Sequence, residues 1–124
     1  MIIREARKRG VGRIIVTHPL LGPQFTSMSV EQLREAASLG TYIEIVASNL
    51  RRPEAERARV IDAIRAIGPE LTFVSSDSGL VGTPNHADAL AQTAKMLRQS
   101  GFDEPALNRM FKENPARLVK LPPL

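Results

Sequence analysis

Three side chains in this sequence have the types and spacing that acid–base or metal chemistry needs. Asp77 ends an apolar run in the stretch LTFVSSDSGLVGTPNHADAL, residues 71–90, and His86 follows the loop into which that run leads. The other histidine, His18, comes late in a second apolar run, RIIVTHP. Carboxylates and imidazoles bind divalent metals and transfer protons near neutral pH. His18, Asp77 and His86 are therefore the candidate chemical groups.

The loop after Asp77 supplies the predicted substrate-binding residues, which are Ser78, Gly79 and His86. Ordinary structural roles stay open beside the chemical ones. An aspartate often begins a loop, and a histidine in the first turn of a helix often lies at the surface. His18 can equally be a hydrogen-bonded structural residue.

A further acid, Glu44, lies inside the apolar run TYIEIVAS at 41–48, with Tyr42 and Val46 on the same side of the predicted strand. A buried carboxylate needs a partner. A role for Glu44 near the interior of the fold is therefore one interpretation.

The segments that must position these side chains alternate between strand and helix patterns. Short apolar runs predict strands at 13–19, 41–48 and 71–76. Apolar periodicity between capping residues and glycines predicts helices at 29–40, 52–68 and 85–101. Two shorter helical pieces are expected at 103–111 and 114–119, around an Asn-Pro break.

This alternation predicts an α/β fold of three successive βα units with parallel strands, in a single domain over residues 1–124. An open doubly wound sheet and a (β/α) barrel both have this order, and both bind ligands at the carboxyl ends of their strands. His18 and Asp77 are therefore expected at the same end of one sheet. The residues expected on the same face as these two are Ile14, Val16, Phe73 and Ser75.

The composition indicates a globular, cytoplasmic protein. The 124 residues are 43% hydrophobic and 24% charged, and they include no cysteine, which excludes disulfides and thiolate catalysis. No apolar run reaches the roughly 20 residues of a membrane span. The basic start MIIREARKRG lacks the apolar core of a secretory signal. No membrane partner is expected.

The net charge of +4 comes with two clusters of basic residues, one within residues 4–13 and one within 51–65. Surfaces that bind nucleic acid usually interleave aromatic residues or carry a recognisable helix motif. Aromatic residues make up only 4% of this chain. We interpret the two clusters as solvated helix faces and predict no nucleic-acid partner.

A phosphate site is a separate alternative. The GLVG sequence at 79–82 follows a strand and could wrap a phosphate with backbone amides, although no lysine and hydroxyl residue complete a P-loop. An open-sheet protein that binds a phosphorylated ligand at 78–86 is thus one possible function. A plain turn is the simpler interpretation.

Together, IIVTHP, SSDSG and NPARL resemble the C-terminal part of a metal-dependent hydrolase of the amidohydrolase superfamily. Those enzymes are distorted (β/α)8 barrels that hydrolyse amide or ester bonds in small molecules with one or two divalent metals. The resemblance implies that the three strands are the sixth to the eighth of such a barrel. It implies that His18 is a metal ligand, and that Asp77 binds the metal and takes a proton from the hydrolytic water. NPARL, at 114–118, would close the barrel, and the metal would be zinc, with manganese or iron as alternatives.

The resemblance covers only half of a barrel. A (β/α)8 barrel takes about 250 residues, whereas this chain has 124 and no His-x-His motif. A catalytic zinc site needs about three protein ligands, and His18 with Asp77 supplies two. We expect a fragment, a half-barrel subunit that forms a homo-oligomer or binds its missing N-terminal half, or a degenerate relative. A non-enzymatic α/β oligomerisation module is the alternative outside the enzymes.

Overall fold

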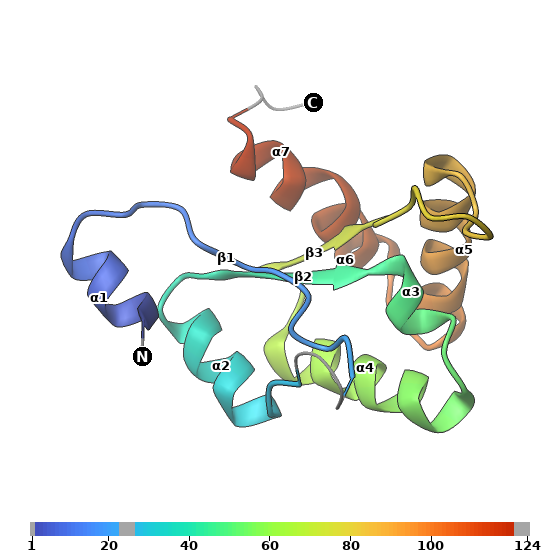
Figure 1. The fold of residues 1–124 in the computed structure, drawn as a ribbon, viewed down its shortest axis with the longest axis horizontal. Coiled ribbons are helices and arrows are strands. Elements are labelled where there is room, and N and C mark those ends of the chain that lie inside the picture. Colours follow the sequence, from blue (N-terminus) through green and yellow to red (C-terminus); the bar gives the residue numbers. More distant parts are fainter. Residues whose placement is uncertain (1, 23–26, 121–124) are drawn as a thin grey trace.

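The computed structural model describes residues 2–22 and 27–120, which form an α/β fold around one three-stranded sheet (Figure 1). The strands β1 (Ile15–Val16), β2 (Tyr42–Val46) and β3 (Thr72–Ser75) are parallel and lie in the order β1-β2-β3. The expected α/β fold with three parallel strands alternating with helices is confirmed, and the strands form an open sheet. Each strand lies within its predicted segment, but β1 has only two residues.

The three long predicted helices are present as α2 (Val30–Ser38), α4 (Glu54–Ile67) and α5 (His86–Gln99). The expected capping box is formed, because the Ser29 hydroxyl accepts from the Gln32 N–H and the Gln32 side chain accepts from the Ser29 N–H. Two helices were not predicted, α1 (Ile2–Lys8) and the single turn α3 (Ala47–Leu50). Each is too short for apolar periodicity to reveal.

The C-terminal helical segment differs from its prediction. Instead of a break at the Asn-Pro dipeptide, α6 (Glu104–Asn108), a π-helical turn η1 (Arg109–Glu113) and α7 (Asn114–Leu118) follow one another directly. Proline normally ends a helix because its ring clashes with the carbonyl four residues earlier. The wider π turn immediately before Pro115 makes room for the ring, so the chain stays helical.

The buried core lies between the sheet and its helices. Ile45 and Val74 pack with Ile64 of α4, Leu97 of α5 and Met110 of η1. A second cluster joins Ile43 to α1, α2 and α4 and contains Ile3, Leu33, Ala36 and Ala63. Both clusters contact the same face of the sheet, since Ile43, Ile45 and Val74 alternate in register. Right-handed crossovers between neighbouring parallel strands place successive helices on one face in this way.

The other face of the sheet carries the remaining alternate residues, and here one expectation was wrong. The register places Ile15, Tyr42, Glu44, Phe73 and Ser75 on this second face. Phe73 and Ser75 were expected there, but Ile14 and Val16 instead pack against the second core cluster on the helix side. The prediction assumed that side chains alternate between the two faces from Ile14 through Val16 to His18. Such alternation requires extended backbone, whereas the backbone at His18 is left-handed, with a φ of 52°.

Helix α7 lies at the amino ends of the strands. The buried side chain of Asn114 donates from Nδ2 to the carbonyl oxygens of Pro69, at 2.8 Å, and Thr72, at 2.7 Å, where β3 begins. At the other end of α7, the Leu118 carbonyl accepts from Arg13, at 3.0 Å, just before β1. The helix therefore extends from the start of β3 toward the segment that precedes β1 (Figure 1).

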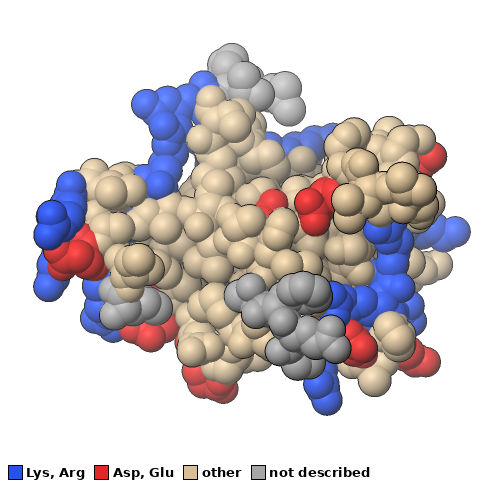
Figure 2. Space-filling view, viewed as in Figure 1, with Lys and Arg blue, Asp and Glu red and all other residues tan. Residues whose placement is uncertain are grey.

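Many of the basic residues have structural partners. Arg4 pairs with Glu35, and Arg9 pairs with Glu5. Arg7 donates to four backbone carbonyls, those of Val11, Gly12, Leu39 and Gly40. In Figure 2 the Lys and Arg side chains lie mainly around the periphery, and the centre of the face in view is largely uncharged. In residues 2–22 and 27–120, no helix has the length and apolar character needed to cross a bilayer.

Candidate acid–base site at the carboxyl ends of the strands

Three adjacent strands each contribute one acid–base side chain to a single cluster. His18 follows the end of β1, Asp77 follows the end of β3, and Glu44 lies within β2 between them. Nε2 of His18 is 3.6 Å from Oε2 of Glu44 and 3.7 Å from Oδ2 of Asp77. The expectation that His18 and Asp77 lie at the same end of one sheet is confirmed. We call His18, Glu44 and Asp77 the acid–base cluster.

The backbone at two of these positions is left-handed. The φ angles are 52° at His18 and 47° at Asp77, a region that costs a residue with a Cβ about 1–2 kcal/mol. Such conformations persist where the surroundings enforce them, and they concentrate at functional sites. Here the turn follows directly after each strand, and it is at these turns that the two side chains meet.

Glu44 belongs to the cluster but was not among the predicted site residues. Its side chain is only 13% exposed. Oε1 accepts from the Ser75 hydroxyl at 2.9 Å, and Oε2 accepts from the backbone N–H of His18 at 3.3 Å. Both carboxylate oxygens thus have donors, as a largely buried carboxylate requires. The signal in the sequence was a single charged residue inside the apolar strand YIEIV.

His86, a predicted substrate-binding residue, contacts Ser76, which directly precedes Asp77 in the sequence. It is the first residue of α5, directly after the N-cap Asn85. Its Nδ1 lies 2.7 Å from the Ser76 hydroxyl. Three consecutive residues, the last of β3 and the two that follow it, therefore each contact a different side chain. Ser75 contacts Glu44, Ser76 contacts His86 and Asp77 contacts His18.

The other two predicted substrate-binding residues lie in the loop between β3 and α5. The Ser78 hydroxyl is buried and has no hydrogen-bond partner among the described residues, and the Ser78 N–H donates weakly to Ser76 Oγ at 3.4 Å. The Gly79 N–H donates to the Thr83 hydroxyl at 3.3 Å, so this amide is already occupied by the loop itself. The tip of the loop exposes two apolar side chains, Leu80 and Val81.

The donors for a metal ion are incomplete. Across residues 2–22 and 27–120, no group of three or more His, Cys, Asp or Glu side chains is arranged to hold one. Glu44 has both oxygens engaged by donors, which leaves His18 Nε2 and Asp77 Oδ2 as facing groups. An imidazole nitrogen and a carboxylate oxygen suit zinc or manganese. Two such donors are fewer than the three that a catalytic zinc site takes from the protein.

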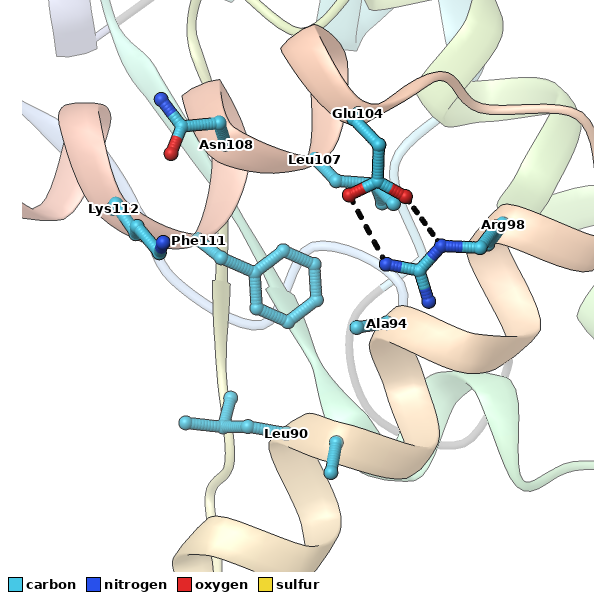
Figure 3. A pocket seen from close by; sticks show the side chains of 9 residues that line it. Leu90, Ala94, Arg98, Glu104, Leu107, Asn108, Phe111 and Lys112 are labelled. Carbon is cyan, nitrogen blue, oxygen red and sulfur yellow. Dashed lines mark hydrogen bonds and ion pairs between the residues drawn. The ribbon is translucent and has the colours of Figure 1, made fainter.

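A groove of the described surface lies away from this cluster. A cavity of about 330 Å³ opens between α5 and the α6–η1 segment, and none of the predicted site residues lines it. Figure 3 shows Leu90, Ala94 and Phe111 along it and the Arg98–Glu104 ion pair at one end. The hydrogen bond from Arg98 holds the pKa of the Glu104 carboxyl below its ordinary value. Helices form the groove, and none of His18, Glu44 and Asp77 lines it.

Comparison of the chain with the models of known protein families and with curated protein sequences finds no match in either.

Proposed function

We propose that this chain forms the last three βα units of a metal-dependent hydrolase of the amidohydrolase type, which cleaves an amide or ester bond in a small molecule. One observation carries the proposal. The acid–base cluster brings an imidazole within 3.7 Å of two carboxylates at the carboxyl ends of three adjacent parallel strands. In barrel enzymes, catalytic groups come from the ends of several different strands at this end of the sheet.

The arrangement of the sheet also supports a barrel segment. The strands lie in sequence order, and the buried clusters that hold the helices contact one face. A doubly wound sheet reverses its strand order and has helices on both faces. The position of α7 at the amino ends of the strands, tied to Pro69, Thr72 and Arg13, suits a helix that closes the end of a barrel.

In this proposal His18 and Asp77 would hold a divalent metal, which when bound supplies Lewis-acid activation of a water molecule. Asp77 is the proton acceptor, because its carboxylate is 46% exposed and can be reached by water. Glu44 is a positioning residue. By accepting the His18 N–H it stabilises the left-handed backbone that directs the imidazole toward Asp77.

Zinc binding tests the ligand assignment. We expect the wild-type chain to bind zinc weakly and to lose it on dialysis, since it supplies fewer than three ligands. His18→Ala is expected to weaken binding at least about tenfold, because loss of even an outer partner of a metal ligand costs 10- to 100-fold. Isothermal titration with zinc chloride measures both affinities.

The matched control is His86→Ala, since the chain has two histidines. Its zinc affinity should stay at the wild-type value. Stoichiometric zinc that survives dialysis of the wild-type chain, or equal losses in the two variants, would show that the ligand set is wrong.

The incomplete site predicts an assembly. Outer strands β1 and β3 each pair only with β2 among the described residues, and Ile15, on the second face of the sheet, is 43% exposed. Open strand edges recruit further strands. We expect the chain to self-associate, most simply as a two-fold dimer that buries this face, or to require a separate chain that completes the barrel. Sedimentation equilibrium at micromolar concentration measures this.

Ile15→Lys places a charge on the edge strand and should shift the equilibrium toward monomer. Gln92→Lys adds the same charge at an exposed position on α5 and should leave it unchanged. A wild-type chain that stays monomeric and unfolds cooperatively would argue for a self-contained open sheet.

A further inference from the structure

The contact between Ser76 and His86 bears on which ring nitrogen of neutral His86 carries the proton. Neutral imidazole carries its proton on one ring nitrogen and accepts at the other, and the partner of each nitrogen decides which. Nδ1 of His86 lies 2.7 Å from Ser76 Oγ, which is within hydrogen-bond distance. Either Nδ1 donates to the hydroxyl, or the hydroxyl donates to Nδ1.

The surroundings of Ser76 favour the second arrangement. The backbone N–H of Ser78 points at Ser76 Oγ from 3.4 Å and uses one of its lone pairs. Among the described residues, Ser76 Oγ contacts no group other than this N–H and His86 Nδ1. The hydroxyl proton therefore has one protein acceptor within reach, which is Nδ1. If Nδ1 donated instead, the hydroxyl would receive two donors and its own proton would find no protein partner.

We propose that Ser76 holds neutral His86 in the tautomer protonated at Nε2, so that this histidine presents an N–H donor to an oxygen of the substrate. Nδ1 is consumed by Ser76, while Nε2 makes no hydrogen bond within the described residues and the His86 side chain is exposed. Ser76 directly precedes Asp77 in the segment that follows β3, so one short segment contacts both His86 and His18.

The chemical role of this donor rests on the proposed hydrolase function. Cleavage of an ester or amide develops negative charge on the carbonyl oxygen, and a fixed N–H donor stabilises that charge. Asp77 accepts a proton, whereas His86 in this tautomer can only donate from Nε2. The two residues would therefore act on different atoms, Asp77 on the water and His86 on the carbonyl oxygen. Ser76 is a positioning residue that acts through His86.

The tautomer can be measured without any substrate. The full chain labelled with 15N histidine is studied by long-range 1H–15N correlation at about pH 8.5, where imidazoles are neutral, and His18→Ala assigns the two rings. The wild-type spectrum should show His86 protonated at Nε2 with Nδ1 as a hydrogen-bonded acceptor. In Ser76→Ala, Nδ1 should shift to the position of an unbonded acceptor and the Nδ1-protonated tautomer should increase.

Two controls separate this role from a general structural one. Ser78→Ala removes a hydroxyl that makes no hydrogen bond within residues 2–22 and 27–120, and it should leave the His86 pattern unchanged. Ser76→Thr keeps the hydroxyl and should restore it. A wild-type His86 protonated at Nδ1, or a Ser76→Ala spectrum identical to wild type, would overturn the proposal, and the wild-type measurement suffices should the variant not fold.

A kinetic measurement then tests the link to hydrolysis. His86→Ala should lower kcat by about 10²-fold, as for the loss of one donor to a developing oxyanion. Unchanged kcat would remove the assigned role from His86 while leaving the tautomer result intact. Failure of the wild-type chain to hydrolyse any ester would instead count against the proposed function.

Discussion

Asp77→Asn should lower the zinc-dependent rate of ester hydrolysis by about 10²- to 10⁴-fold, the range that general acid–base catalysis contributes. Asparagine has the same shape but cannot accept a proton at neutral pH. It also tolerates the left-handed backbone that Asp77 adopts, with φ 47°, so the fold should be retained. The loss should therefore lie in kcat.

The measurement is the hydrolysis of p-nitrophenyl acetate by the full chain with zinc, above the rate given by zinc alone. Asp62→Asn is the matched control, because Asp62 lies on α4 in an exposed pair with Arg65. It should keep the wild-type rate. An Asp77→Asn variant as active as wild type would remove Asp77 from the chemistry, whatever its contact with His18.

Asn114→Ala should destabilise the folded chain by about 2–4 kcal/mol. The Asn114 side chain is fully buried, and its Nδ2 donates to the carbonyls of Pro69 and Thr72. Each net hydrogen bond contributes about 1 kcal/mol, and a buried carbonyl left without a donor costs about 1–3 kcal/mol. Asn114→Asp should cost more, because it would place an oxygen against both carbonyls.

Urea unfolding followed by circular dichroism measures this effect as a lower midpoint at an unchanged slope. Asn108→Ala is the matched control on the same helical segment, since Asn108 is exposed and bonds only to Glu113 among the described residues. Its free energy of unfolding should change by no more than about 0.5 kcal/mol. Equal effects at both positions would mean that the ties from Asn114 to β3 contribute little.

The alternation of strands and helices could be predicted because strong local signals mark it. Ser29 and Asn85 cap helices as expected, and the apolar runs at 41–48 and 71–76 contain β2 and β3. The continuous helix through Pro115 could not, because local sequence does not reveal a π turn. The two-residue strand β1 depends on its pairing with β2, which is a tertiary contact.

The candidate site, like the fold, could be predicted only in part. His18 and Asp77 could be placed together because both follow apolar runs, and parallel strands bring their carboxyl ends to one edge. Glu44 joins them through hydrogen bonds to Ser75 and to the His18 N–H. Those bonds depend on strand register and on left-handed backbone at His18. Neither can be derived from the pattern of apolar residues.

The three consecutive contacts at the end of β3 affect which kinds of mutation the site can survive. A substitution at Ser75, Ser76 or Asp77 removes one contact and leaves the other two. The insertion or deletion of one residue within β3 would turn every later side chain to the opposite face of the sheet. Glu44, His86 and His18 would then lose their partners in a single event. The length of β3, more than any one of its residues, should therefore be the least variable property of this site.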